Sequence, residues 1–158
     1  KDRETPLHFA TRNKHKDICE LLIKHEANVN ARGLWDLTPI HIAVREEDLD
    51  ICQLLIKYKA DINLKSIYSS TALFYAILKG NIKITTLLIE HQANVNYKND
   101  SGETSLHMAV FGGNYEICQL LIDKGVDVNA KDKNGKIPLD YAKEHPKIYE
   151  LLKKPQKP

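Results

Sequence analysis

The chain has 158 residues, 42% of them hydrophobic and 28% charged, and its 23 basic residues nearly balance 21 acidic ones to give a net charge of +2. This length and apolar content suit one folded domain, and so small a net charge argues against a nucleic-acid partner. No apolar run approaches the roughly 18 residues of a membrane span, and no secretory leader is present, so we expect no membrane partner.

A six-residue string recurs along the chain at intervals of 33 residues. Its copies are Thr-Pro-Leu-His-Phe-Ala (5–10), Thr-Pro-Ile-His-Ile-Ala (38–43), Thr-Ala-Leu-Phe-Tyr-Ala (71–76), Thr-Ser-Leu-His-Met-Ala (104–109) and Ile-Pro-Leu-Asp-Tyr-Ala (137–142). Threonine suits a helix N-cap and proline suits the first helical turn, so each string predicts the start of a helix. A fixed period of this length indicates a stack of repeated units rather than one folded-back core.

A second string follows in the same register and predicts a second, apolar helix in each unit. Its copies are Ile-Cys-Glu-Leu-Leu-Ile (18–23), Ile-Cys-Gln-Leu-Leu-Ile (51–56 and 117–122) and Ile-Thr-Thr-Leu-Leu-Ile (84–89). In the first unit we expect helices over Pro6–Arg12 and Lys16–His25. The two strings together resemble the ankyrin repeat, and the resemblance covers essentially the whole chain. It implies an all-α solenoid in which each unit is a β-turn finger, a short helix, a tight turn and a longer antiparallel helix.

We expect a single ankyrin-repeat domain over residues 1–158, with units at about 1–32, 33–65, 66–98, 99–131 and 132–154. The last unit is two residues shorter than the fourth, has Pro146 in its inter-helix turn and ends in a polar tail. We interpret it as a shortened C-terminal cap. Because the chain begins inside a finger, without Met or a polar capping helix, we also expect it to be a piece of a longer protein.

Cys19, Cys52 and Cys118 occupy the same position in their units. Equivalent points on neighbouring stacked helices should lie roughly 8–10 Å apart, whereas a disulfide requires Cα atoms within about 7 Å. We therefore predict free, buried thiols and a reducing, cytoplasmic compartment. The Lys-, Ile- and Asn-rich composition would suit an intracellular bacterium, in which case delivery into a host cell is the alternative location.

Ankyrin repeats usually place a glycine after the second helix, where a left-handed C-cap is wanted. Only Gly125 matches this pattern, and the same position holds Glu26, Lys59 and Gln92 in the first three units. If these three residues adopt the left-handed conformation, each costs about 1 kcal/mol relative to glycine. The sequence therefore predicts an array of only moderate stability.

His8, His41 and His107 recur at the fourth position of the six-residue string. Histidines on successive units form a ladder rather than the tetrahedral cluster that zinc requires, so the ankyrin resemblance implies structural hydrogen bonding for them. The chain also lacks a Gly-rich phosphate loop, a nucleophile elbow and a His-Glu-x-x-His motif. We predict no catalytic residue, no metal and no cofactor, so the segment is not expected to be an enzyme.

In ankyrin repeats the finger and first-helix surface positions vary with the ligand, which implies that they contact the partner. In units two to four these positions hold seven large apolar residues, namely Leu34, Trp35, Leu37, Ile67, Tyr68, Leu78 and Phe111. An exposed apolar patch of this size usually marks an interaction site. We predict a monomeric, non-catalytic protein–protein interaction module or scaffold that binds its partner on a concave face. Trp35 and Tyr68 would be central anchors, and the polar rim would be Arg12, Arg45, Glu46 and Lys79.

Three alternatives remain at this stage. The apolar side chains could pack on one another and stiffen the fingers instead of binding a partner. The segment could be the targeting domain of a larger enzyme or bacterial effector. It could also bind a nucleotide, with Trp35 and Phe111 stacked on the base and Lys79 or Arg45 on a phosphate.

Overall fold

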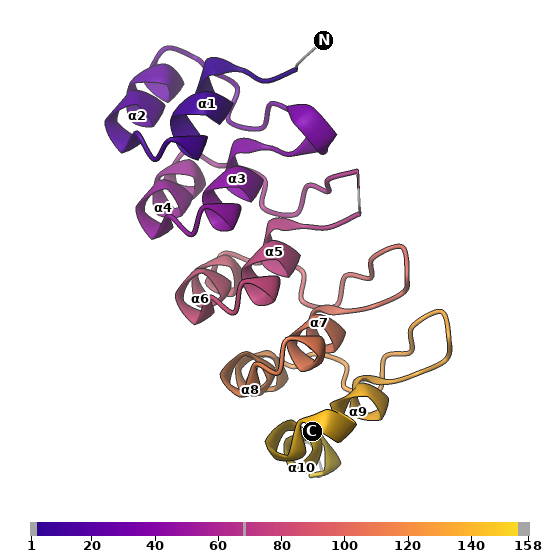
Figure 1. Cartoon of the computed structure of the whole chain (residues 1–158). Coiled ribbons are helices and arrows are strands. Elements are labelled where there is room, and N and C mark those ends of the chain that lie inside the picture. The colour runs from indigo at the N-terminus through magenta and orange to yellow at the C-terminus, as the bar shows by residue number, and fades with distance from the viewer. Residues whose placement is uncertain (1–2, 68, 155–158) are drawn as a thin grey trace.

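The described residues of the computed structural model, 3–67 and 69–154, form five stacked helix pairs, which we number as units 1 to 5 (Figure 1). The pairs are α1 (Pro6–Arg12) with α2 (Lys16–Lys24), α3 (Pro39–Arg45) with α4 (Leu49–Lys57), α5 (Ala72–Leu78) with α6 (Ile82–Glu90), α7 (Ser105–Phe111) with α8 (Tyr115–Asp123), and α9 (Pro138–Tyr141) with α10 (Pro146–Lys153). Short 3₁₀ helices, η1 (Leu34–Asp36) and η2 (Ala142–Glu144), lie in the second finger and directly after α9. No strand occurs in these ranges, and the predicted all-α solenoid is confirmed.

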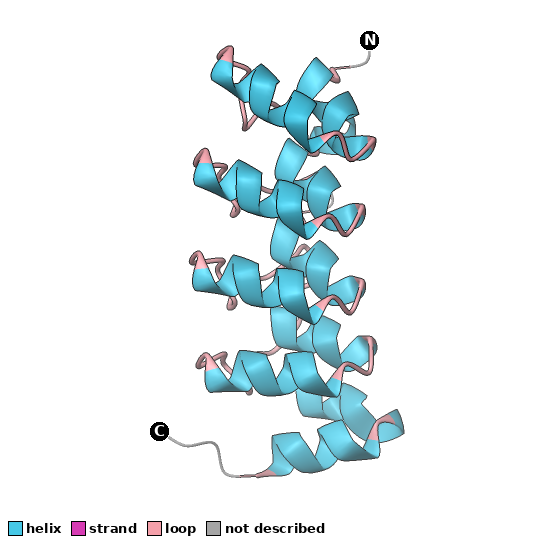
Figure 2. Ribbon diagram, turned by 90° about the vertical axis from the view of Figure 1, so that its left-hand side faces the viewer, coloured by secondary structure: helices cyan, strands magenta, loops and turns pink. Residues whose placement is uncertain are grey.

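The helices form two layers, and the loops lie at the edges of the stack. The odd-numbered helices α1 to α9 form one layer, and the even-numbered helices α2 to α10 form the other (Figure 1). The finger loops project beyond the odd-numbered layer, and successive fingers lie side by side. Seen after a quarter turn, the second helices of the units repeat one above another with nearly constant orientation (Figure 2). The 33-residue period is therefore the translation from one unit to the next.

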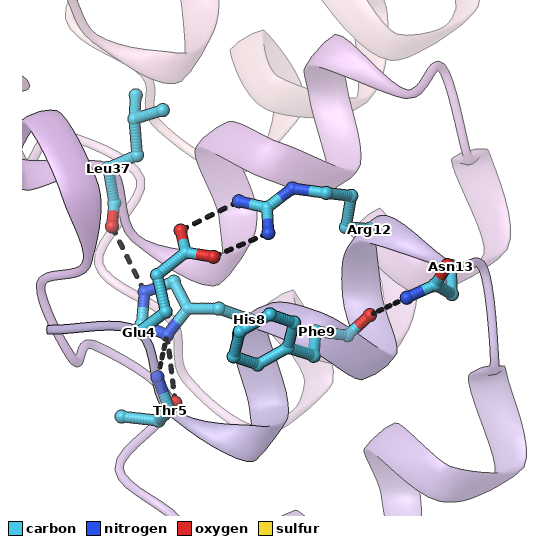
Figure 3. A network of polar contacts seen from close by, with 7 residues as sticks. All are labelled: Glu4, Thr5, His8, Phe9, Arg12, Asn13 and Leu37. Carbon is cyan, nitrogen blue, oxygen red and sulfur yellow. Dashed lines mark hydrogen bonds and ion pairs between the residues drawn. The ribbon is translucent and has the colours of Figure 1, made fainter. Parts of the chain in front are cut away.

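The histidine of the string closes the start of the first helix and ties it to the next unit. The backbone N–H of each threonine N-cap donates to Nδ1 of the histidine three residues later, at 3.1 Å in all three pairs, Thr5–His8, Thr38–His41 and Thr104–His107. Because Nδ1 accepts a hydrogen bond, the ring proton lies on Nε2. There His8 donates to the carbonyl of Leu37 at 3.1 Å and His107 to that of Lys136 at 3.3 Å, both in the next finger (Figure 3). The predicted structural role of the histidines is confirmed.

The core lies between the two helix layers and between the units. Ile51, Ile84 and Ile117, which begin the second string in units 2, 3 and 4, are fully or almost fully buried. Cys19, Cys52 and Cys118 are free and buried, as predicted. Burial raises the pKa of the Cys52 and Cys118 thiols to about 12, so both stay protonated and act as small apolar groups.

The asparagine at the end of each of the first three units bonds to the backbone of the next unit. Its Oδ1 accepts from a backbone N–H 31 residues further on, at 2.8 Å for Asn30–Asp61 and 2.9 Å for both Asn63–Asn94 and Asn96–Asp127. These bonds hold the loops in register along the edge opposite the core. The Asn129 side chain makes no such bond within the described residues.

Replacing Asn63 with alanine is expected to lower the free energy of unfolding by about 1 kcal/mol. The substitution leaves the Asn94 N–H without its partner and removes a second bond, from Asn63 Nδ2 to the Gln92 carbonyl at 3.3 Å. Urea unfolding followed by circular dichroism measures the change. Asn129→Ala is the matched control and should cost much less, and equal losses for the two variants would contradict a role in joining units.

The left-handed turn after the second helix occurs where the sequence predicted it. Glu26, Lys59 and Gln92 have φ values of 67°, 62° and 69°, close to the 75° of Gly125. A second left-handed position, in the turn between the two helices of a unit, was not predicted. It holds Lys14 and Glu47, and then Gly80 and Gly113, with φ between 57° and 68°. The two glycines at a 33-residue step were the signal for it.

The fifth unit departs from this pattern because Pro146 occupies the equivalent inter-helix position. The proline ring restricts φ to about −65°, so the left-handed turn is impossible there. Instead α9 is only four residues long, η2 follows, and α10 begins at Pro146 itself.

Candidate binding surface

Each finger of units 2 to 5 is a closed loop, and neighbouring fingers bond to each other. The first residue of each finger donates its N–H to the carbonyl four residues later, at 2.8–3.0 Å, in the pairs Gly33–Leu37, Ser66–Ser70, Asn99–Glu103 and Asp132–Lys136. Between fingers, the N–H of Ile67 donates to the carbonyl of Trp35 at 3.0 Å, and that of Lys133 donates to Ser101 at 2.9 Å. The face formed by the fingers and the odd-numbered helices is therefore built before any partner arrives.

The second finger has an unusual backbone at its tip. Trp35 has φ 57° and ψ 28°, and Asp36 has φ 54°, so two consecutive residues are left-handed. Asp36 occupies the position that Gly102 and Gly135 hold in later fingers, but no glycine explains the conformation of Trp35. A bulky residue in this region costs roughly 1–2 kcal/mol. Such strain concentrates at functional sites, which makes Trp35 a candidate.

A small pocket of about 80 Å³ lies beside Trp35, where units 1 and 2 meet. Six of the predicted partner-binding residues line it, namely Arg12, Leu34, Trp35, Leu37, Arg45 and Glu46. The remaining lining residues are Glu4 and Ile42, which were not among the predicted site residues. The tertiary structure thus brings together the predicted apolar and charged groups of the first two units.

Glu4 and Arg12 form a two-pronged ion pair at one side of this pocket (Figure 3). Arg12 Nη2 lies 2.7 Å from Glu4 Oε1, and Nη1 bonds to Oε2. The Glu4 side chain is only 7% exposed. The hydrogen bonds from Arg12 lower the pKa of Glu4, and the same bonds raise the pKa of Arg12. Arg12 is therefore held by a neighbouring carboxylate rather than being a free cation at the rim.

The predicted apolar residues do not all reach the surface. Five of them are between 41% and 54% exposed, namely Leu34, Trp35, Ile67, Leu78 and Phe111. Leu37 was wrongly expected on the surface: it is 2% exposed, and its carbonyl binds both the His8 ring and the Gly33 N–H. Tyr68 lies outside the described residues. Among the polar residues Arg45 and Lys79 are exposed and Glu46 is half-buried.

Phe111 and Arg45 are partly engaged in local packing. The Phe111 ring meets the Tyr141 ring edge-on, with centroids 4.8 Å apart, and Arg45 lies 6.0 Å from the centre of the Tyr75 ring. Trp35 belongs to unit 2 and Phe111 to unit 4, so the two rings should lie roughly 16–20 Å apart. They are too far apart to enclose one base, and the predicted nucleotide arrangement is therefore wrong.

A second apolar surface lies at the outer face of unit 1. Phe9, Ile18 and Leu21 are 52%, 47% and 56% exposed there. In units 2 and 3 the residues equivalent to Ile18 are Ile51 and Ile84, and both are 0% exposed. This face has the apolar composition of a stacking face, which distinguishes it from the finger surface.

Within residues 3–67 and 69–154, no three His, Cys, Asp or Glu side chains are grouped so that they could hold a metal ion. Of the helices in the same ranges, none has both the length and the apolar character that a membrane crossing demands.

The stacked helix pairs, joined fingers and preformed face define a helical repeat protein with an elongated binding surface. A sequence model of ankyrin repeats (three copies) matches residues 1–66, 40–132 and 73–157. The chain therefore belongs to the ankyrin-repeat family, whose repeats are generally protein–protein interaction modules and are typically non-catalytic. A search of the curated proteins found no match.

Proposed function

We propose that this chain is a non-catalytic recognition module that binds a protein partner on the face formed by the fingers and the odd-numbered helices. The observation that carries the proposal is Trp35, which is half-exposed, left-handed in its backbone and placed at the mouth of the pocket between units 1 and 2. Tryptophan next to a pocket with a polar rim is the pattern of an interface hot spot.

The preformed geometry supports the same function. The finger is closed by the bond from Gly33 to Leu37, and the Trp35 carbonyl is tied to Ile67 in the next finger. The Glu4–Arg12 pair holds one wall of the pocket. A partner would therefore order few residues of this chain on binding, which reduces the entropic cost of association.

Leu34, Ile67 and Leu78 extend the apolar surface from this pocket toward unit 3, and Arg45 and Lys79 add charge beside it. Phe111, packed on Tyr141, is a peripheral contact in this proposal. A targeting domain of a larger enzyme or effector would use the same face, because its task would also be to hold a protein partner.

Replacing Trp35 with alanine is expected to weaken binding of a partner by about 30-fold or more, the loss typical of a hot-spot tryptophan. A partner would first be selected from a displayed library of protein fragments. Its affinity would then be measured by calorimetry for the unmodified chain, Trp35→Ala and Leu34→Ala, with circular dichroism to verify folding. Trp35 is the only tryptophan, so a blue shift of its fluorescence on binding is a second readout.

The matched control removes exposed apolar side chains from the outer face of unit 1. Phe9→Ala and Leu21→Ala delete residues at least as exposed as Trp35 but on another surface. Their effect on affinity should stay within about 2-fold. A partner that is lost with the control variants and retained by Trp35→Ala would move the binding site to the outer face of unit 1.

A further inference from the structure

A column of four basic residues runs along the bases of the fingers. Arg32, Lys65, Lys98 and Lys131 each directly precede the first residue of a finger, are exposed and are 33 residues apart. We call this set the basic column. Because the 33-residue period is the step from one unit to the next, the column places one cation on each unit boundary.

The basic column is held in place by backbone carbonyls and by an aromatic ring. Arg32 Nη1 donates to the carbonyl of Lys65 at 2.8 Å, and Lys98 Nζ donates to the carbonyl of Lys131 at 2.9 Å. Lys65 Nζ lies 4.3 Å from the centre of the Tyr97 ring. Each of these cations keeps further N–H donors that the described contacts do not use. The charges are therefore positioned and still able to bind an anion.

No member of the basic column forms an ion pair with a carboxylate in the described ranges. Three carboxylates of the fingers are already bound within the chain. Asp36 pairs with Arg3 at 3.6 Å, Glu103 accepts from Asn99 at 2.8 Å, and Asp132 accepts from the Tyr141 hydroxyl and from backbone N–H groups of its own finger. Asp100 and Glu46 are the acidic exceptions near this face. The finger bases therefore carry a positive charge that the chain does not neutralise.

We propose that the partner segment bound by this face is an extended acidic polypeptide, with Asp or Glu side chains at every third residue paired to the basic column and one apolar side chain in the pocket beside Trp35. This inference rests on the proposed function and deepens it, because it specifies the chemistry of the partner.

The spacing of the units supports an extended ligand. Neighbouring units lie roughly 8–10 Å apart. A polypeptide in the polyproline II conformation has three residues per turn and rises about 3.1 Å per residue, so every third side chain returns to the same side after about 9 Å. Acidic residues at this interval would meet successive cations of the column without bending the peptide. Opposite charges on the two partners also raise the association rate and exclude basic competitors.

The test uses synthetic peptides as defined probes. One labelled peptide has Glu at every third residue, a central Leu and Pro between them, and a second has the same composition in shuffled order. Fluorescence anisotropy at low salt measures their affinity for the whole chain. We expect the periodic peptide to bind about 10-fold more tightly, and binding to weaken as salt rises.

Two variants with the same loss of charge separate the basic column from general electrostatics. The test variant is Arg32→Gln, Lys65→Gln, Lys98→Gln and Lys131→Gln, and it should lose at least about 10-fold in affinity. The control variant changes four exposed lysines outside the fingers, Lys83→Gln, Lys124→Gln, Lys143→Gln and Lys147→Gln. It should bind almost as the unmodified chain does. Thermal unfolding of both variants verifies that they fold.

The outcomes distinguish this inference from the proposed function. If the periodic and shuffled peptides bind equally, or if the two variants lose affinity equally, the acidic-partner inference is wrong. If a selected protein still depends on Trp35 in that case, the proposed function stands without it. Tighter binding of a single-stranded oligonucleotide than of the periodic peptide, through the same column, would overturn the inference in favour of a nucleic-acid ligand.

Discussion

Acidification from about pH 6.5 to pH 4 is expected to remove about 3 kcal/mol of stability through His41 alone. His41 is fully buried, and this burial lowers its pKa from 6.5 to about 4, against the opposing effect of the nearby Leu64 and Ser70 carbonyls. The unfolded chain therefore takes up a proton near pH 6.5, whereas the folded chain does so only near pH 4. The stabilising contribution is complete above pH 6.5 and is lost as the pH falls through this interval.

Urea unfolding at several pH values between 7 and 4 measures this dependence. Burial also lowers the pKa of His8 and His107, so these residues add to the loss in the same direction. The matched variant is His41→Phe, because unit 3 already holds Phe74 at the equivalent position, where it is 1% exposed. His41→Phe should flatten the pH dependence, and an unchanged profile would show that His41 does not couple folding to protonation.

Replacing Glu26, Lys59 and Gln92 together with glycine is expected to raise the free energy of unfolding by about 3 kcal/mol, roughly 1 kcal/mol for each site. All three residues have φ between 62° and 69°, a conformation that strains a residue with a Cβ atom and not glycine. The three sites lie in different units, so their effects should add. Chemical unfolding of the single and triple variants measures the gain.

Gly125→Ala provides the reciprocal experiment. Gly125 has φ 75°, and a Cβ atom there would meet no atom within 4 Å, so the substitution tests backbone conformation without a steric clash. It should cost about 1 kcal/mol. A glycine at the exposed helical position Gln53 should also cost about 1 kcal/mol. A triple variant no more stable than the unmodified chain would mean that the left-handed turns relax at no cost.

Local features of the sequence were sufficient for much of the fold. A helix start needs only an N-cap threonine and a first-turn proline, and the Thr5–Ala10 string supplies both. The left-handed turns at Glu26, Lys59 and Gln92 followed from their alignment with Gly125. The buried cysteines followed from the spacing of stacked helices. Each of these features depends on residues within one unit, or on the constant step between units, and a periodic sequence displays both.

The candidate site could be predicted only in part. The residue types at the finger positions pointed to Leu34 and Trp35, and both are exposed beside the pocket. The same reasoning was wrong for Leu37, since position in the repeat does not reveal how deeply a side chain packs against the neighbouring unit. It also did not foresee that Glu4 would bind Arg12, because the partners of a charged side chain depend on where two units meet.

The sequence by itself determined the period, the class of fold, the helix starts and the set of variable surface positions, because short-range chemistry repeated 33 residues apart dictates all of them. Only the tertiary structure decided which of those positions form one surface. The left-handed backbone of Trp35, the pocket between units 1 and 2 and the alignment of the basic column all arise from contacts between units. Such contacts depend on how neighbouring units are placed in space, which no single repeat encodes.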